Sequence, residues 1–527
     1  MKISSRIPAF REVFNRSGVF HNPRALFQAR QYSAEVTPPI QIAVVGSGPS
    51  AFYTVLHILQ KQNPKQKVCI DIFEKWPVPF GLSRYGVAPD HPEVKNCENK
   101  FEEIIERAST LHHTDSTTSE VNFYGNVEIG KDVSLRTLKD YYNMILFAYG
   151  CSDERSLAVP GANLPGVISS RKLVGWYNGL PDSQNLDPPL DKVEDVTIIG
   201  NGNVALDIAR VLLAPHDEVW ENTDLGKKAL EKLKKSTVKR VRIVARRGFS
   251  QSAFTNKEFR ELLELTKHGI YFQPIDPDIM AKHKLLKGKL VRAEKRRLDM
   301  MEKYFKQHCQ NGSYVIPEGS KTWSLEYLKS PAEIYPNTYD KTILSATKFQ
   351  INKLKESLSV DESKGGKVEI VSTDESVTVK NELLITSIGY KGLPLETMDG
   401  VGIDFDMQRG VISNARSRVV DKHGDVLDGL FVTGWIQHGP SGVIASTMMN
   451  SFATGSEILK DLSEKQFEAK SGFKALEKHF IENNIKYTKW DDWKKIDERE
   501  RELGSKSGKV RDKILSVDEM FAICDKK

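Results

Sequence analysis

The sequence predicts an α/β fold built from two Rossmann-like units, with the second unit inserted into the first. Two glycine-rich turns, GSGPSA at residues 46–51 and GNGNVA at residues 200–205, lie about 154 residues apart. Each turn follows a short apolar run, 42–45 or 196–199, and precedes a segment with helical apolar spacing. In a strand–turn–helix unit of this kind the glycines let the backbone approach a pyrophosphate, which then rests on the amide groups of the helix N-terminus. The pair of turns therefore predicts two bound dinucleotides.

Residues in and just after the two turns are candidate contacts for the phosphates. For the first turn they are Gly46, Gly48 and Ser50, and for the second they are Asn201, Gly202, Asn203 and Val204. A single turn of this type occurs by chance, whereas two turns in the same setting are a much stronger signal.

The strand after each turn suggests which dinucleotide binds there. The apolar run 68–73 ends in Glu74, whose carboxylate can accept hydrogen bonds from ribose hydroxyls and would repel a 2′-phosphate. The run 241–245 ends instead in Arg246 and Arg247, whose guanidinium groups can form paired hydrogen bonds with a 2′-phosphate. At each position the alternative is an ordinary charge at the end of a strand. The two contexts together favour FAD or NAD at the first turn and NADP at the second.

Strand and helix patterns alternate along most of the chain, which predicts parallel sheets covered by helices. We expect residues 40–153 and 390–527 to form the domain with the first turn, and residues 154–389 to form the inserted domain. The last strand of the first domain is expected at residues 429–435.

Two further segments differ in composition from this alternating pattern. Residues 310–380 carry many Lys, Ser and Glu and predict a polar, hairpin-rich insertion in the second domain. The charged tail beyond residue 465, with Trp490 and Trp493, predicts helices that pack on the outside of the fold.

The first 32 residues have the composition of a mitochondrial transit peptide. They hold six basic residues and one acidic residue, and Arg30 to Ser33 has the form of a matrix-protease cleavage site. The alternative is a basic tail without a targeting role. Without residues 1–32 the formal charge of +6 falls by five to +1, which does not support a basic field for nucleic acid.

Cysteine spacing and hydropathy exclude several other classes of protein. The five cysteines, Cys69, Cys97, Cys151, Cys309 and Cys524, include no Cys-x-x-Cys pair. This argues against a disulfide-relay flavoenzyme and against a zinc or iron–sulfur site, so we expect no metal in this chain. No run of 18 apolar residues occurs, and we expect a soluble protein with at most peripheral membrane association.

Several longer stretches resemble the adrenodoxin reductases, the mitochondrial NADPH-dependent ferredoxin reductases. The stretches are residues 74–82, 86–96, 175–181, 202–207, 246–248, 434–435 and 439–444. They match the family in order and spacing over nearly all of the chain after the first forty residues, so the sequence is identified as a member of that family.

The resemblance implies two Rossmann-like dinucleotide-binding domains, with the NADP domain inserted into the FAD domain. It implies an FAD enzyme that takes hydride from NADPH and passes single electrons to a mitochondrial [2Fe–2S] ferredoxin. Iron–sulfur cluster assembly, haem A formation and steroid-type hydroxylation are the pathways that such electrons would support. We expect no side chain to act as a catalytic residue, because hydride passes directly between the stacked rings.

The segment around residue 440 is expected to border the flavin. Gly439 to Gly442 interrupt the chain, and residues 443–459 then have helical apolar spacing. The amide groups at the start of that helix would stabilise negative charge on a reduced flavin. The resemblance implies FAD contacts from Leu82, Val127, Trp435, Gly442, Val443 and Ile444.

Three other residues are given roles by the resemblance alone. Glu258 corresponds to a contact of the NADP adenosine portion. His91 and Asp207 correspond to polar residues near the flavin, and a purely structural histidine and aspartate are the open alternatives.

A basic segment follows in the second domain. Between Lys282 and Arg297 there are eight Lys and Arg residues and one acid, and such a run is by default a solvated helix face. In the family, basic residues of the NADP domain dock a small acidic ferredoxin. The resemblance implies that this patch includes Arg260, Arg292, Arg296 and Arg297.

The resemblance also implies a location in the mitochondrial matrix, with peripheral inner-membrane association left open. Two other functions remain alternatives. One is an electron-feeding module like that of glutamate synthase, which normally carries cluster-binding cysteines, and the other is a non-catalytic nucleotide-binding protein.

Overall fold

In the computed structural model of the chain, the described residues are 38–114, 118–279, 290–310, 313–355 and 369–526. The predicted transit peptide and four lysines of the basic segment (Lys282, Lys284, Lys287 and Lys289) lie outside these ranges. Two mainly parallel sheets carry the two glycine turns, which confirms the predicted α/β class.

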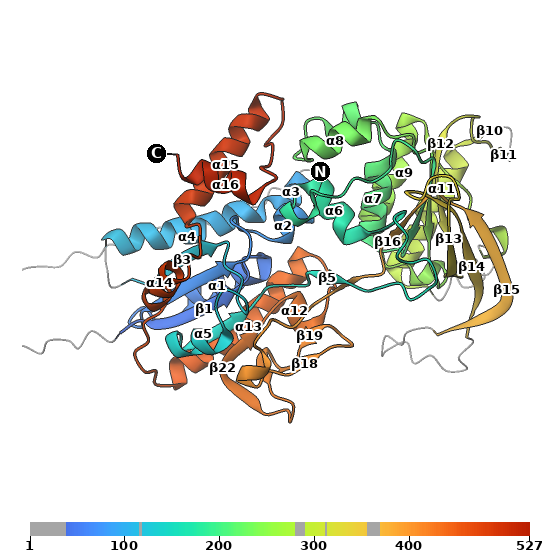
Figure 1. Ribbon diagram of the computed structural model, residues 1–527. Coiled ribbons are helices and arrows are strands. Elements are labelled where there is room, and N and C mark those ends of the chain that lie inside the picture. The colour runs from blue at the N-terminus through green and yellow to red at the C-terminus, as the bar shows by residue number, and fades with distance from the viewer. Residues whose placement is uncertain (1–37, 115–117, 280–289, 311–312, 356–368, 527) are drawn as a thin grey trace, which may run out of the picture. The chain divides into compact units, whose positions relative to one another are not determined.

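The first sheet has seven strands in the order β20-β21-β22-β4-β1-β2-β3. Their bounds are β1 Ile40–Val45, β2 Val68–Glu74, β3 Glu120–Gly125, β4 Met144–Phe147, β20 Asn414–Ala415, β21 Arg418–Val420 and β22 Val426–Val432. From β3 to β22 the pairing is parallel, while β20 and β21 add an antiparallel edge. The last strand thus returns beside the first segment of the chain, where blue and orange ribbons meet in Figure 1.

Several helices accompany this sheet, among them α1 Pro49–Lys61, α4 Cys97–Thr114, α5 Leu135–Tyr141 and α13 Ile444–Glu464. Helix α13 packs along α1, and the two are linked by a 3.0 Å hydrogen bond between His57 and Ser456. Gly455 permits this approach, because a Cβ there would lie 2.9 Å from the His57 ring.

The second sheet has six parallel strands in the order β6-β16-β7-β8-β12-β9. Their bounds are β6 Val167–Ser169, β7 Asp195–Ile199, β8 Arg240–Val244, β9 Ile270–Phe272, β12 Lys321–Glu326 and β16 Leu383–Thr386. The helices of this part are α6 Ser170–Asn178, α7 Asn203–Leu213, α8 Lys227–Lys234, α9 Asn256–Glu264 and α11 Arg292–Gln307. Strands β7 and β16 are buried along their whole length, as expected for parallel strands covered by helices.

The chain crosses between the sheets through a small antiparallel ribbon. On the outward path β5 (Asp153–Glu154) pairs with β17 (Tyr390–Lys391) of the return path. Residues 38–527 form one compact unit, so the predicted domain boundaries at 153 and 389 stay predictions.

The polar insertion contains the predicted hairpins within its described part. Strands β13 (Lys329–Pro336), β14 (Leu344–Leu354) and β15 (Ile370–Lys380) form an antiparallel sheet. Further short elements are α2 Leu82–Tyr85, α3 Pro92–Lys95, α12 Trp435–His438, β10 Cys309–Gln310, β11 Ser313–Tyr314, β18 Phe405–Asp406 and β19 Val411–Ile412.

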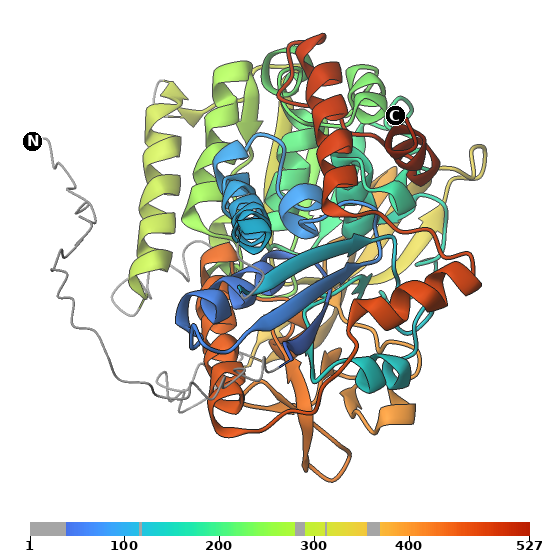
Figure 2. The same cartoon turned by 90° about the vertical axis from the view of Figure 1, so that its left-hand side faces the viewer.

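The tail is helical as predicted, and its longest helix packs on the outside of the fold with one face buried and the other exposed. It forms α14 (Phe473–Glu482), α15 (Trp490–Ser505) and α16 (Val517–Cys524), and Figure 2 shows α15 and α16 next to each other in red. Trp493 is fully buried, and its ring centroid lies 5.6 Å from that of Phe80. The tail therefore completes the apolar core beside the first sheet.

Candidate dinucleotide sites

The first glycine turn joins β1 to α1 at the carboxyl end of the sheet. Gly46 has a φ of +98°, and a Cβ there would lie 2.6 Å from the Cα of Tyr149. Around Gly48, in contrast, no atom of the described residues beyond its two chain neighbours lies within 4 Å of a Cβ position. The fold itself thus requires Gly46, whereas Gly48 borders open space. Helix α1 has no side-chain cap at its N-terminus, so the amide groups of its first turn can bind a phosphate.

Glu74, the last residue of β2, faces this turn. One carboxylate oxygen accepts hydrogen bonds from the Ser47 backbone N (3.0 Å) and Oγ (2.7 Å). The Glu74 carbonyl oxygen accepts a hydrogen bond from the backbone N of Val127 at 2.8 Å. Next to Leu82, a Cβ on Gly81 would lie 3.2 Å from the Cα of Gly48. The structure therefore brings Leu82, Glu74 and Val127 to the first turn.

The segment after β22 reaches the same turn from the other end of the chain. Gly434 has a φ of +72°, and a Cβ there would lie 2.5 Å from Ser50 Oγ. Trp435 follows directly, and its ring stacks on Tyr390 with centroids 5.8 Å apart.

Helix α13 starts at Ile444, one residue later than expected. Gly442 has a φ of +83°, and the Val443 side chain is 53% exposed. The Val443 backbone N donates to Ser446 Oγ at 3.0 Å, so Ser446 satisfies one amide group at this helix start. The exposed apolar Val443, the open space at Gly48 and the carboxylate of Glu74 together fit a flavin dinucleotide.

The second glycine turn repeats this geometry between β7 and α7. Gly200 has a φ of +113°, and a Cβ there would collide with the Ser387 carbonyl oxygen. Gly202 borders open space, as Gly48 does. The turn is tied to a neighbouring loop, because Asn203 Oδ1 accepts from the Thr255 backbone N (2.8 Å) and the Asn201 carbonyl from the Ala253 N (3.2 Å).

Arg246 and Arg247 come just after the carboxyl end of β8. The glycine turn follows the carboxyl end of β7, the strand beside it. Arg246 is exposed and Arg247 half-buried, and neither guanidinium has an ion-pair or hydrogen-bond partner within the described ranges. Glu258, near the start of α9, accepts a hydrogen bond from Thr255 Oγ1 and so lies near the turn. Two unpaired guanidinium groups at the end of the second strand fit the 2′-phosphate of NADP.

Sequence reasoning missed a charged cluster around Arg210. Its guanidinium binds Asp90 through two hydrogen bonds of 2.6 and 3.0 Å, and it also donates to Asp207 at 2.9 Å. The cluster joins the segment after the first turn to α7 and α9, because His91 Nε2 lies 2.8 Å from a Glu261 carboxylate oxygen. The i,i+3 spacing of Asp207 and Arg210 was the available sequence signal.

The cluster changes the acidity of its members. Burial raises the pKa of Asp207 to about 6, although the positive charge of Arg210 acts in the opposite direction. Burial alone would lower the pKa of His91, but the hydrogen bond with Glu261 and the charge of Asp90 raise it overall. Both residues thus have charged partners within the fold, and their place relative to a flavin stays a prediction.

The basic patch is only partly exposed, and the docking role expected for Arg297 is contradicted. Arg297 is 5% exposed, donates to the Phe254 carbonyl at 2.9 Å, and stacks 4.6 Å from the Phe254 ring centroid. It lies on the buried face of α11, with Leu298, Met301 and Tyr304. Arg260, Arg292 and Arg296 are exposed.

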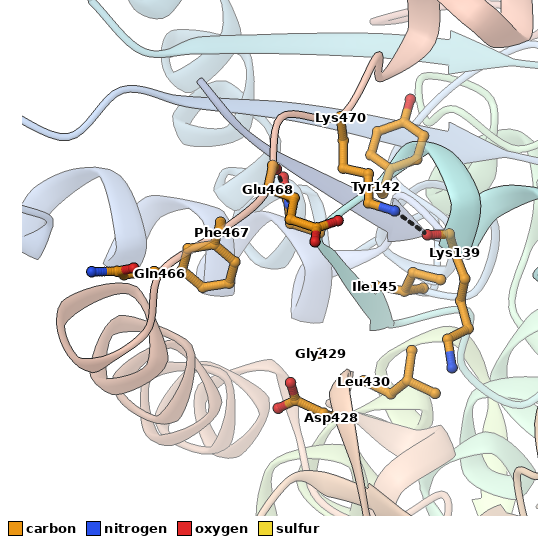
Figure 3. Close-up of a pocket in the computed structure, with 11 residues that line it drawn as sticks. Lys139, Tyr142, Ile145, Asp428, Gly429, Leu430, Gln466, Phe467, Glu468 and Lys470 are labelled. Atoms are coloured by element: carbon orange, nitrogen blue, oxygen red, sulfur yellow. Dashed lines mark hydrogen bonds between the residues drawn. The ribbon is translucent and has the colours of Figure 1, made fainter. Parts of the chain in front are cut away.

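A separate cavity of about 210 Å³ lies near the amino-terminal ends of β4 and β22, at the end of the first sheet opposite to the glycine turn. Figure 3 shows Lys470 reaching toward Lys139, with Nζ 3.5 Å from the Lys139 carbonyl oxygen. Since the glycine turn lies at the carboxyl ends of the strands, this cavity does not belong to the dinucleotide site.

The described ranges show neither a candidate metal site nor a candidate membrane-spanning helix. They contain no group of three or more His, Cys, Asp or Glu residues that could hold a metal ion. No helix among them is both long and apolar enough to cross a membrane.

The chain was then compared with known proteins. No protein-family model matches it. It is 40% identical over 507 residues to the probable NADPH:adrenodoxin oxidoreductase, mitochondrial, of Saccharomyces cerevisiae, covering 94% of this chain and 98% of the relative. It is 37% identical over 492 residues to the NADPH:adrenodoxin oxidoreductase, mitochondrial, of Homo sapiens, covering 93% and 92%.

Solved structures agree with these relatives. FprA of Mycobacterium tuberculosis in complex with NADPH superimposes with a TM-score of 0.79 at 30% identity, over 92% of this chain and 99% of that one. These relatives match the chain over nearly its full length, and the structure has two glycine turns whose following strands end near Glu74 and Arg246. The chain belongs to the NADPH:adrenodoxin oxidoreductase family.

Proposed function

We propose that this chain oxidises NADPH through a bound FAD and passes the electrons singly to an iron–sulfur ferredoxin. One observation carries the proposal. The two glycine turns are similar, but the strand after the first ends in a negative charge and the strand after the second is followed by positive charges. Glu74 follows at the first turn, and Arg246 and Arg247 follow at the second. Names of the relatives agree, since they are NADPH:adrenodoxin oxidoreductases.

The first site would hold FAD. Gly46 would allow the tight turn, Gly48 and Ser50 would border the pyrophosphate, and Glu74 would accept hydrogen bonds from a ribose. Leu82, Val127, Trp435 and residues 442–444 would line the rest of the cofactor. The start of α13 would place its positive end near the pyrimidine edge of the flavin, where it stabilises negative charge.

The second site would hold NADPH. Residues 201–204 would bind the pyrophosphate at the start of α7, Arg246 and Arg247 the 2′-phosphate, and Glu258 the adenosine portion. FAD supplies the redox chemistry when bound, accepting a hydride and releasing electrons one at a time. The protein contributes the positions of the rings and a fixed charge environment.

Ferredoxin docking would use the exposed basic residues Arg260, Arg292 and Arg296, without Arg297. An acidic ferredoxin would be attracted to them over a range set by the ionic strength, so the encounter would weaken in salt.

The relatives carry the word mitochondrial in their names. We propose the mitochondrial matrix as the location, with residues 1–32 as the transit peptide and peripheral contact with the inner membrane. The glutamate-synthase-like alternative loses support, because the five cysteines are all free and do not gather into a cluster site.

The test is the visible spectrum of the purified chain without residues 1–32, followed by anaerobic titration with NADPH and NADH. Oxidised [2Fe–2S] ferredoxin is then added at low and at high salt. We expect flavin bands that NADPH bleaches in preference to NADH, and ferredoxin reduction that is faster at low salt.

Other outcomes would change the assignment. A colourless protein that does not take up FAD would contradict the flavoenzyme and favour a nucleotide-binding protein without catalysis. Bleaching without ferredoxin reduction would keep the flavoenzyme and require a different electron acceptor.

A further inference from the structure

The antiparallel insertion β13–β14 borders the loop that carries Arg246 and Arg247. Three successive carbonyl oxygens of this loop accept hydrogen bonds from that side. The Ala245 carbonyl accepts from the Lys329 N (3.1 Å) and the Arg247 carbonyl from the Leu328 N (3.1 Å). The carbonyl between them, on Arg246, accepts from Asn352 Nδ2 at 3.0 Å. The peptide planes on both sides of Arg246 are therefore held by the insertion.

The middle contact is the one that depends on the identity of a side chain. The outer two come from backbone N–H groups, which any residue except proline supplies at positions 328 and 329. Asn352 is 1% exposed, and its Nδ2 also donates to Ser330 Oγ at 2.8 Å. With both amide hydrogens engaged, the orientation of the Asn352 side chain is fixed.

The backbone around this contact is constrained as well. Leu328 has a φ of +60°, in the left-handed region that a leucine rarely adopts. Its carbonyl accepts a hydrogen bond from the backbone N of Asn352 at 2.8 Å. Such a conformation persists only where the surrounding contacts impose it. The insertion thus contacts the loop of Arg246 and Arg247 through Leu328, whose backbone is strained, and through the buried side-chain amide of Asn352.

The consequence concerns the two guanidinium groups. Neither has a partner within the described part of the chain, so no ion pair with a described residue holds either in position before a ligand binds. The direction in which both side chains leave the backbone depends on the peptide between Arg246 and Arg247, whose carbonyl is bound by Asn352. Bidentate recognition of a phosphate is sensitive to that direction.

We propose that Asn352 is a positioning residue for 2′-phosphate recognition, acting on Arg246 and Arg247 through the carbonyl of Arg246. The proposal rests on the proposed function, because it assumes that the second site binds NADPH. It assigns the antiparallel insertion a role in selecting NADPH over NADH.

The test compares Asn352→Ala with wild type in steady-state kinetics with NADPH and NADH, using the FAD-loaded enzyme and ferredoxin. We expect the KM for NADPH to rise about 3- to 10-fold, the effect of one lost hydrogen bond, with kcat unchanged. The constants for NADH should stay within about twofold. Calorimetry should show weaker binding of 2′,5′-ADP and unchanged binding of 5′-ADP.

Gln350→Ala is the matched control. Gln350 lies two residues away on β14, but its amide donates to carbonyl oxygens of Thr373 and Glu375 on β15. We expect this variant to keep the discrimination of wild type. Equal losses in both variants, or equal losses for NADPH and NADH in Asn352→Ala, would show general loosening of the sheet and overturn the proposal.

Failure of the proposed function is distinguishable from failure of this inference. A wild type that does not discriminate NADPH from NADH would contradict the NADPH assignment. A second outcome would contradict only the inference. In it, wild type prefers NADPH, the double variant Arg246→Ala/Arg247→Ala loses this preference, and Asn352→Ala keeps it. The arginines would then recognise the 2′-phosphate without help from Asn352. If Asn352→Ala does not fold, Ser330→Ala replaces it, with a loss of discrimination of about twofold expected and no loss contradicting the role.

Discussion

The guanidinium of Arg84 lies 2.5 Å from the carboxylate of Glu500, and both side chains are buried although 416 positions separate them in the chain. Arg84 belongs to α2, directly after the residues that border the first glycine turn, and Glu500 belongs to α15. The same carboxylate accepts hydrogen bonds from Arg511 (3.0 Å) and from the backbone N of Ile514 (2.9 Å). The tail is thus fastened to the segment beside the candidate FAD site.

Replacing Glu500 by Gln should lower the free energy of unfolding by about 3–5 kcal/mol, because Arg84 and Arg511 would remain buried without that negative charge. Urea unfolding at saturating FAD measures the change. Glu502→Gln on the same helix is the control, since Glu502 pairs with Arg499 and Lys506 on the exposed surface. Its effect should stay within about 1 kcal/mol. Equal effects of the two variants would contradict the importance of the buried contact.

Gly48 and Gly46 should respond differently to alanine, although they belong to one turn. A Cβ on Gly48 would have no described residue beyond its chain neighbours within 4 Å, so Gly48→Ala should fold within about 1 kcal/mol of wild type. It should bind FAD more weakly by about 1–3 kcal/mol. The measurements are urea unfolding of the FAD-free chain and fluorescence titration with FAD.

Gly46→Ala should destabilise the FAD-free chain as well, by about 1–3 kcal/mol or more, because its φ of +98° and the nearby Tyr149 Cα both oppose a side chain. If Gly48→Ala bound FAD as tightly as wild type, the open space at Gly48 would not be the pyrophosphate site.

The strands and turns could be predicted from the sequence because their signals are local. The run 196–199 and the glycines after it specify a strand, a turn and a helix within about twenty residues, and the structure has them there. The charges at Glu74 and at Arg246 are local signals too, because Glu74 is the last residue of β2 and Arg246 comes two residues after the end of β8.

The buried charges could not be predicted in this way. Trp493 and Glu500 lie in a segment rich in charge, and only contacts with residues near position 80 show that their face is buried. The burial of Arg297 could not be predicted for a similar reason, because the basic residues around it suggested an exposed helix face. Its spacing from Met301 and Tyr304, one and two helical turns on, was the signal for the buried face.

The contact between His91 and Glu261 should make stability depend on pH. The folded pKa of His91 is raised, so the protonated ring stabilises the fold fully below its unfolded pKa of about 6.5, and this contribution is lost as the pH rises through the folded value. His91→Gln should therefore destabilise the chain more at about pH 5.5 than at about pH 8.5.

Denaturant unfolding at both pH values measures this difference, and the Glu261→Gln background is the control. Arg210, with a nitrogen 3.4 Å from His91 Nε2, opposes protonation, while Asp90 and Glu261 favour it. In the Glu261→Gln background the pH dependence of the His91→Gln effect should be smaller. The same effect at both pH values in the wild-type background would show that His91 is not titrating in this range.

Arg296 is exposed and its neighbour Arg297 is buried. Replacing each by Ala should therefore distinguish a role in ferredoxin docking from a role in packing of the fold. Arg297→Ala removes two hydrogen bonds to the carbonyls of Ser252 and Phe254 and the contact with the Phe254 ring, so it should lower stability by about 1–3 kcal/mol. Arg296→Ala should leave stability within about 0.5 kcal/mol and raise the KM for ferredoxin, more at low than at high salt. Urea unfolding and ferredoxin-dependent turnover at two salt concentrations measure the two effects. A salt-dependent rise in the ferredoxin KM for Arg297→Ala with unchanged stability would return that residue to the docking surface.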